Sequence, residues 1–224
     1  MAQQNILPDP NNRRSLGGDD GSGSYGPGFK SVKLTSNQQV MTDRTNSGRL
    51  VQRSHSYHKW TVDIEYNPMT QDEFLPVYAF LLERRSTLAP FYVKLPQYLG
   101  QSPATAQVTG TSATVNIAGS TQVRIDNNDG NNMGVGELFT FSAPSDHKKA
   151  YMVTKIDQTN SGYDLLTITP PLAKTVPSGA NLEFADYGSV KAPLIKVVQV
   201  GDTQQYSLNT NNLYSFSLKL EEVQ

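Results

Sequence analysis

Residues 58–85, HKWTVDIEYNPMTQDEFLPVYAFLLERR, determine the main elements of the fold, because a clear strand is followed at once by a clear helix. In the first part the apolar residues alternate with polar ones; they are Trp60, Val62, Ile64 and Tyr66. A period of two gives a strand one apolar face and one polar face. The sequence therefore predicts a strand with one face buried and the other solvated.

The residues after this strand carry the signals of a helix N-terminus. Thr70, with Glu73 three residues later, forms a capping box. Met69 and Phe74 are spaced as a hydrophobic staple. An apolar stripe at helical spacing follows, made of Phe74, Val77, Tyr78, Leu81 and Leu82. We expect an amphipathic helix over about 71–85 that covers one face of a sheet.

Pro76 conflicts with an uninterrupted helix. A proline beyond the first turn has no N–H to donate, and its ring crowds the preceding turn. Two interpretations stay open: the helix is kinked at Pro76, or it begins a few residues after Thr70. Arg84 and Arg85 mark its end, where the negative end of the helix dipole favours cations.

The composition of the 224-residue chain is typical of a turn-rich β protein. It has 17 Gly, 13 Pro and 11 Tyr, and aromatic and β-branched residues pack well on a pleated sheet. The absence of cysteine excludes disulfides, thiolate nucleophiles and cysteine-based zinc sites. The net charge of -1 gives no long-range attraction to nucleic acid or to an anionic membrane. No apolar run approaches the ~20 residues needed to cross a bilayer, so no membrane partner is expected.

The character of the sequence divides the chain into three parts. Residues 1–28 are rich in Gly, Asn, Asp and Pro and predict a flexible N-terminal arm. Residues 29–100 and 191–224 contain the strand–helix pair and an alternating final strand, and they predict one β domain. Residues 101–190 predict an inserted β domain, because an insertion into a surface loop costs little free energy.

Short strand-like runs separated by turns characterise the predicted insert. The runs are SATVNIAG, TQVRID, ELFTFSA, KAYMVTKID, DLLTITPPL and NLEFAD. Before the Trp60 strand, TDRTNSG (residues 42–48) predicts a turn. The predicted fold class is mainly β (α+β). It consists of an antiparallel sheet or barrel with one packed helix, interrupted by a small β-barrel or sandwich.

The histidines do not form a metal site in any arrangement that the sequence favours. His55 and His58 are three apart, so on a strand they lie on opposite faces. His147 lies in a predicted turn with no second ligand nearby. We interpret all three as solvated surface side chains.

Two loops have the composition of ligand sites without their spacing. GGDDGSG lacks the Gly-Lys-Ser/Thr ending of a phosphate loop. DNNDGNN (residues 126–132) resembles a calcium loop, but Asn131 stands where an EF-hand needs glycine. A hairpin turn at Asp129-Gly130 is the better prediction for the second loop, with an incidental surface cation as the alternative.

No set of residues in the sequence predicts catalysis. The carboxylates are scattered among strands and turns, and no Gly-x-Ser-x-Gly elbow or Ser-His-Asp set can be assembled. We therefore expect no enzyme activity, no catalytic or metal-binding residues and no cofactor.

The arrangement as a whole resembles the minor tail and distal tail (baseplate hub) proteins of tailed bacteriophages. The resemblance rests on HKWTVDIEYNP, on MTQDEFLPVYAFLLERRSTLAPFYVKLP and on the closing VVQVGDTQQYSLNTNNLYSFSLKLEEV. The segment GELFTFSAPSDHKKAYMVTKIDQTNSGYDLLTITPPLAKTVPSGANLEF (residues 136–184) is similar to a β module of tail and baseplate proteins. Together the two resemblances cover roughly residues 29–224.

The resemblance implies a structural virion protein at the tail tip or baseplate, assembled in the host cytoplasm. Such proteins resemble tail-tube proteins, in which strands of adjacent copies meet to build an inner barrel. The implied partners are other copies in a homo-hexameric ring, the tail tube protein and tail-tip proteins. DNA would pass through the lumen without specific binding.

The residues predicted to matter are structural. The core of the helix-covered sheet is expected to contain Trp60, Val62, Ile64, Phe74, Tyr78, Leu81, Phe216, Leu218 and Leu220. The core of the insert is expected to contain Phe139, Phe141, Tyr151, Val153, Leu166 and Ile168. Three alternative functions stay open: an insert that binds host glycans, another connector of the tail or baseplate, and a tail-associated hydrolase.

Overall fold

The computed structural model describes residues 5–8, 29–95, 107–109, 116–126, 133–160, 162–187, 190–201 and 205–223. Its strands are β1 Phe29–Arg44, β2 Leu50–Tyr66, β3 Phe91–Lys94, β4 Gln122–Asp126, β5 Leu138–Phe141, β6 Tyr151–Asp157, β7 Tyr163–Thr169, β8 Leu182–Tyr187, β9 Val190–Gln199, β10 Tyr206–Leu208 and β11 Tyr214–Glu222. Its helix is α1, Gln71–Arg84.

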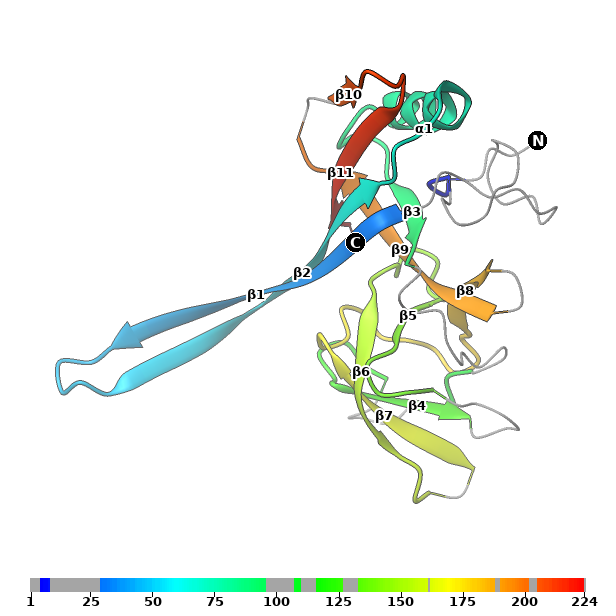
Figure 1. Cartoon of the computed structure of the whole chain (residues 1–224). Helices are drawn as coiled ribbons and strands as arrows, with labels where there is room; N and C mark the ends of the chain where they lie inside the picture. The colour runs from blue at the N-terminus through cyan, green and yellow to red at the C-terminus, as the bar shows by residue number, and fades with distance from the viewer. Residues whose placement is uncertain are drawn as a thin grey trace.

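The strands follow one antiparallel path through the molecule (Figure 1). The order is β1-β2-β11-β9-β8-β5-β6-β7-β4, with β10 added to β11 and β3 added to β9. The predicted mainly β, antiparallel class with one helix is confirmed. Over the residues with described positions the path does not close into a barrel.

Helix α1 begins where the capping box predicts. Thr70 is the N-cap, and its backbone N–H donates to Glu73 Oε2 at 2.9 Å. Pro76 lies inside the helix, so the interpretation of a later start is wrong. Arg85 ends the helix in the left-handed conformation with φ 50°, and its N–H donates to the carbonyl of Leu82.

The larger core lies between α1 and the apolar face of the β1-β2-β11 sheet. Eight of the nine predicted core residues are buried in it, and Tyr78 packs against it partly buried. Phe74 stacks on Tyr214 with ring centroids 4.6 Å apart and lies 5.9 Å from Phe216. The helix therefore shields the apolar side of this sheet and leaves its other side open.

The second core lies in the insert and contains all six residues predicted for it. The two parts are nevertheless joined through one hydrogen-bonded path, because β8 pairs with both β5 and β9. Leu138 and Ala150, which belong to the insert by sequence, are buried in the larger core. The insert is thus seated against the helix-covered domain.

Four residues of the predicted flexible N-terminal arm pack against the body. The N–H of Leu7 donates to the carbonyl of Tyr92 at 2.8 Å, and the N–H of Tyr92 donates to the carbonyl of Asn5. Leu7 is buried in the larger core. Residues 1–28 are therefore not an unattached arm over their whole length; residues 1–4 and 9–28 lie outside the described residues.

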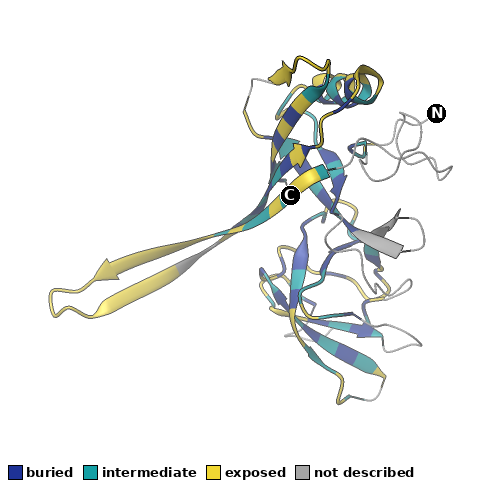
Figure 2. Ribbon diagram, in the orientation of Figure 1, coloured by how far each residue is buried: buried dark blue, intermediate teal, exposed yellow. Residues whose placement is uncertain are grey.

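The longest strands differ from their sequence-based bounds. β1 continues to Arg44, so the turn predicted over 42–48 is confined to the tip that joins it to β2. In the predicted strand SATVNIAG, residues 116–119 form a turn instead, with Asn116 at φ 64°. Figure 2 shows that the outer half of the β1–β2 hairpin is exposed at the residues whose burial is described, 38–44 and 50–53 with Tyr57.

Candidate assembly interface

The outer half of the β1–β2 hairpin, residues 38–44 of β1 and 50–57 of β2, projects from the body and is called here the hairpin projection (Figure 1). A register shift lies between Gln38 and Val40; beyond it the strands stay in one register, from Val40 opposite Ser54 to Arg44 opposite Leu50 at the tip. The tip is held by the N–H of Thr45, which donates to the carbonyl of Arg49 at 3.0 Å, and Gly48 supplies a positive φ of 80°.

Both edges of the hairpin projection lack a neighbouring strand in the described part of the chain. β1 is the first strand of the sheet, so it is paired on one side only. β11 pairs with β2 only between Thr61 and Glu65. An unpaired strand carries a row of backbone donors and acceptors that can bind another strand.

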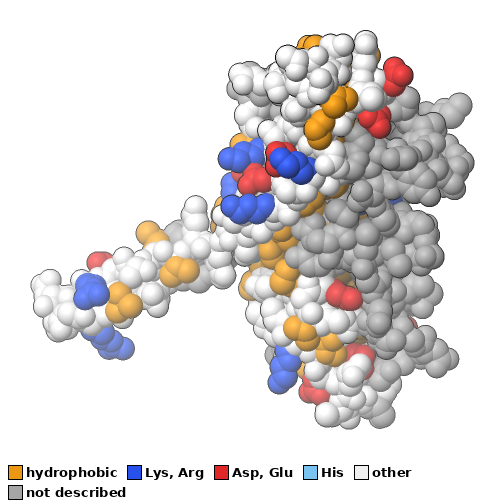
Figure 3. All heavy atoms as spheres, viewed as in Figure 1, with side chains coloured by type: hydrophobic (Ala, Val, Ile, Leu, Met, Phe, Trp, Pro, Cys, Tyr) orange, Lys and Arg blue, Asp and Glu red, His pale blue; other side chains and the backbone are white. Residues whose placement is uncertain are grey.

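Apolar side chains are exposed on both faces of the hairpin projection. Val40 and Leu50 lie on one face and are 50% and 47% exposed. Met41 and Val51 lie on the other face and are 59% and 48% exposed. Figure 3 shows hydrophobic side chains exposed along the face of the projection that is turned toward the viewer. A long exposed hairpin of this kind is typical of a segment that is covered by a partner.

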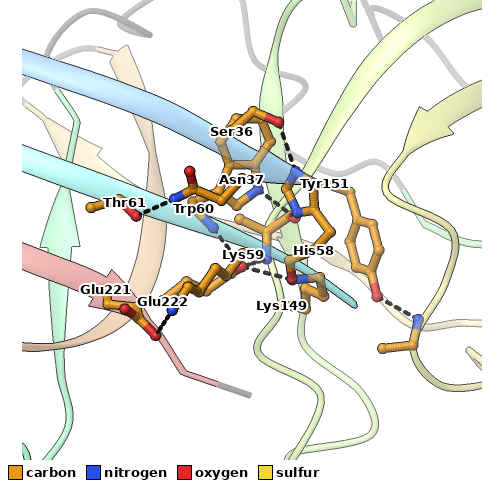
Figure 4. A network of polar contacts seen from close by, with 12 residues as sticks. Ser36, Asn37, His58, Lys59, Trp60, Thr61, Lys149, Tyr151, Glu221 and Glu222 are labelled. Carbon is orange, nitrogen blue, oxygen red and sulfur yellow. Dashed lines mark hydrogen bonds and ion pairs between the residues drawn. The ribbon is translucent and has the colours of Figure 1, made fainter. Parts of the chain in front are cut away.

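The base of the projection is fixed by a buried ion pair (Figure 4). Lys149 Nζ lies 2.7 Å from Glu222 Oε2, and the two side chains are 3% and 1% exposed. Lys149 also donates to the backbone carbonyl of His58 at 2.7 Å. Glu222 accepts from the backbone N–H of Ala150 at 2.7 Å and from that of Trp60 at 3.3 Å.

This pair occupies the edge of β2 at the point where its pairing with β11 ends. The carbonyl of His58 and the N–H of Trp60 are edge groups of β2, and the two charged side chains bind them. The indole N–H of Trp60 donates to the carbonyl of Ala150 at 3.1 Å. The pair therefore joins three segments distant in sequence: β2, the end of β11 and the residues just before β6.

Two buried histidines complete the polar interior. His58 Nε2 lies 2.9 Å from Ser36 Oγ on β1. In the insert, His147 Nε2 lies 2.6 Å from the Tyr151 hydroxyl, which also accepts from the N–H of Ala173 at 2.9 Å. His58 and His147 are only 3% and 2% exposed, so the interpretation of solvated surface histidines is wrong for both. The side chain of His55 lies outside the described side chains.

Burial controls the titration of these groups. It lowers the pKa of His58 from 6.5 to about 4, with a further contribution from the charge of Lys149. Burial likewise lowers the pKa of His147 to about 4 and raises the pKa of Tyr151. Burial also raises the pKa of Glu222, and the ammonium group of Lys149 opposes that rise.

The folded protein should lose stability in mild acid. Because the folded pKa values of His58 and His147 are about 4 against 6.5 in the unfolded chain, the unfolded chain takes up protons first as pH falls. Each histidine then removes on the order of 3 kcal/mol between those two pKa values. Urea unfolding at neutral pH and at about pH 4.5 measures this loss. His58→Gln/His147→Gln should flatten the pH dependence, and an unchanged slope would contradict the assignment.

Among the described residues, no three His, Asp or Glu side chains lie close enough together to hold a metal ion. Most of the predicted calcium loop, residues 127–132, lies outside the described residues. Of the insert's aromatic side chains, Phe139, Phe141 and Tyr151 are buried in its core, where they cannot serve as a sugar-stacking surface. No described helix is long and apolar enough to cross a membrane.

Sequence reasoning missed the charged pair at the base of the projection. Lys149 and Glu222 are ordinary surface residue types, and they are separated by 73 positions. One signal was available: Glu222 falls on the apolar register of the alternating final strand, after Phe216, Leu218 and Leu220. A carboxylate in that register predicts a buried partner.

Comparison with known proteins gives two matches. Residues 20–98 match the family described as "Distal tail protein pb9, A domain, N-terminal". The chain is also 29% identical over 203 residues to Distal tail protein pb9 of Escherichia phage T5. That alignment covers 88% of this chain and 93% of the phage T5 protein.

Proposed function

We propose that the chain, which is similar to the distal tail protein pb9 of Escherichia phage T5, forms a ring joining the tail tube to the tail tip. The ring is a homo-hexamer in the virion, assembled in the host cytoplasm. Its neighbours are the tail tube protein and the tail-tip or baseplate proteins. The role is structural and not catalytic.

The observation that carries this proposal is the hairpin projection. Its two edges have no strand beside them in the described part of the chain, and its apolar side chains are uncovered. An identical chain supplies a strand edge of matching length. A head-to-tail contact between identical chains closes into a ring when the rotation between copies divides the circle.

The β1-β2-β11 sheet has one face covered by a helix and one open polar face, which is compatible with a position in the wall of a ring. Helix α1 covers the apolar face, through contacts such as that of Phe74 with Phe216. The opposite face presents Lys33 and Lys219 to solvent, with the half-buried Asp63 opposite both of them. We place the polar face toward the lumen, through which DNA passes without specific binding, and the helix toward the outside.

Charged substitutions on the hairpin projection should abolish ring formation and leave the fold intact. We expect Val40→Lys/Leu50→Lys to be monomeric, because both side chains are about half exposed in the single chain and become buried only in the ring. Size-exclusion chromatography with light scattering measures the state of assembly, and thermal melting should shift by only a few degrees.

The helix offers a matched control. Leu75 and Leu82 on α1 are 47% and 53% exposed, close to the values of the two projection residues. Leu75→Lys/Leu82→Lys changes the net charge and the exposed apolar area in the same way and should still form rings. The hairpin projection would not be the interface if the Val40→Lys/Leu50→Lys variant still formed rings. The same conclusion would follow if only the Leu75→Lys/Leu82→Lys variant failed to form them.

A further inference from the structure

The base of the hairpin projection contains a buried histidine at a point where the pairing of its two strands is irregular. We propose that protonation of His58 in mild acid releases the base of the projection from the insert before the chain as a whole unfolds. This opening goes beyond the proposed function, because it takes place within a single chain. Only its consequence for assembly, the loss of ring contacts in mild acid, rests on the proposed function.

The backbone pairing is irregular next to this histidine. The pair formed by Gln38 and His58 is followed by the pair formed by Val40 and Ser54. Residues 55–57 of β2 therefore face one residue of β1. Extra residues in one strand interrupt the ladder of hydrogen bonds and bend the strand. The projection thus meets the body where a regular ladder does not oppose a change of direction.

Three parts of the molecule meet at His58, which is buried, and their contacts are called here the His58 joint (Figure 4). On β1, Ser36 Oγ lies 2.9 Å from His58 Nε2. From the insert, Lys149 Nζ donates to the backbone carbonyl of His58 at 2.7 Å. On β2 the imidazole packs edge-on against the indole of Trp60, with ring centroids 4.8 Å apart. A neutral imidazole therefore packs where β1, β2 and the insert meet.

The surroundings of His58 do not accommodate a second proton. His58 Nδ1 is buried and has no hydrogen-bond partner among the described residues. On β1 the contacting residue, Ser36, is uncharged, and the residue that contacts His58 from the insert, Lys149, is a cation. The carboxylate of β11, Glu222, is already bound to Lys149, and Lys59 of β2 is paired with another carboxylate of β11. A protonated His58 would be a second buried cation beside Lys149.

These surroundings determine the direction of the pH effect. Burial, and after it the charge of Lys149, lowers the pKa of His58 from 6.5 to about 4 in the closed joint. In an open joint the solvated imidazole would return to about 6.5, so opening takes up a proton as pH falls. The ratio of open to closed joints should therefore rise about tenfold per pH unit between those two values. Opening the joint costs less than unfolding the domain, so it comes first.

The single tryptophan of the chain reports on the joint. Trp60 is buried, and its indole N–H donates to the carbonyl of Ala150 at 3.1 Å. Opening should hydrate the indole and shift its fluorescence emission to longer wavelength. In the full-length protein we expect this shift between about pH 6 and pH 4.5, with the β-sheet signal of circular dichroism retained. No shift, or a simultaneous loss of the circular dichroism signal, would overturn the inference.

Two histidine variants assign the effect to one side chain. His58→Gln cannot take up the proton and can still bond to Ser36, so it should keep its neutral-pH emission down to about pH 4.5. His147→Gln removes the other buried histidine, which contacts Tyr151 inside the insert, and should leave the shift of Trp60 unchanged. A full shift in His58→Gln, or its loss only in His147→Gln, would refute the role of His58.

Hydrogen exchange of the unaltered protein is a second readout that needs no variant. The backbone N–H groups of Trp60 and Ala150 both donate to Glu222, so an open joint exposes them. After correction for intrinsic rates, peptides with these two amides should exchange at least about tenfold faster at pH 5 than at pH 7. The core strand β7 should stay protected. Unchanged exchange at the joint would contradict its opening.

Electron microscopy at the same two pH values separates this inference from the proposed function. The unaltered protein should form rings at pH 7 that come apart at pH 5, whereas His58→Gln should keep its rings at both. Rings that persist at pH 5 with a shifted Trp60 emission would refute the link between the joint and assembly. An absence of rings at pH 7 would refute the proposed function, and the Trp60 titration would still decide whether the joint opens.

Discussion

Replacing Phe74 by aspartate is expected to abolish the folded, soluble protein. Phe74 is 1% exposed and its ring packs against four other aromatic rings, those of Tyr78, Tyr206, Tyr214 and Phe216. Removing a buried phenyl ring costs about 3–5 kcal/mol. The new carboxylate would have no cation beside it and adds a desolvation penalty, so the loss approaches the whole stability of a domain.

The measurement is the soluble yield and the melting temperature of Phe74→Asp against Phe74→Leu. The leucine variant keeps the site apolar and should lose only about 1–2 kcal/mol. It should remain folded and assemble as the unaltered protein does. Normal assembly of Phe74→Asp would show that α1 does not pack against the sheet through this side chain.

Breaking the buried ion pair from one side should be the next most damaging change. Lys149→Met leaves Glu222 with an uncompensated charge at 1% side-chain exposure, and it frees the carbonyl of His58. Breaking a buried pair in this way costs about 3–5 kcal/mol. We expect a matching fall in the free energy of unfolding, measured in urea, together with release of the insert from the base of the projection.

The exposed ion pair of the same sheet is the matched comparison. Lys30 and Glu65 are 57% and 48% exposed, so water already screens their attraction and Lys30→Met should leave the free energy of unfolding almost unchanged. Combining Lys149→Met with Glu222→Leu should recover part of the loss, because no buried charge remains unpaired. A Lys149→Met protein as stable as the Lys30→Met protein would contradict the burial of this pair.

The elements that could be predicted from the sequence are those encoded by patterns of neighbouring residues. The alternation from Trp60 to Tyr66 and the capping box at Thr70 are each contained within a few neighbouring residues, and the structure has a strand and a helix start there. The antiparallel, mainly β class follows from such patterns. The resemblance to phage distal tail proteins, confirmed by the comparisons, rests on the same stretches.

The features that escaped prediction depend on contacts between distant parts of the chain. The polar residues of 42–44 have the composition of a turn, yet pairing with Leu50–Val51 and beyond holds them in a strand. His58 and His147 look like surface residues, and only tertiary packing buries them. The Lys149 ion pair likewise requires the insert to dock at the end of β11, which no local pattern specifies.

Negative-stain electron microscopy of the purified full-length protein is the sharpest test of the proposed ring. The proposed function, with the hairpin projection as the contact between copies, predicts closed rings around a central opening, of six copies as the resemblance to distal tail proteins implies. The projections would lie within the ring wall and would not protrude from it. Uniform single copies, at concentrations where tail proteins assemble, would contradict the assignment of the hairpin as the ring interface.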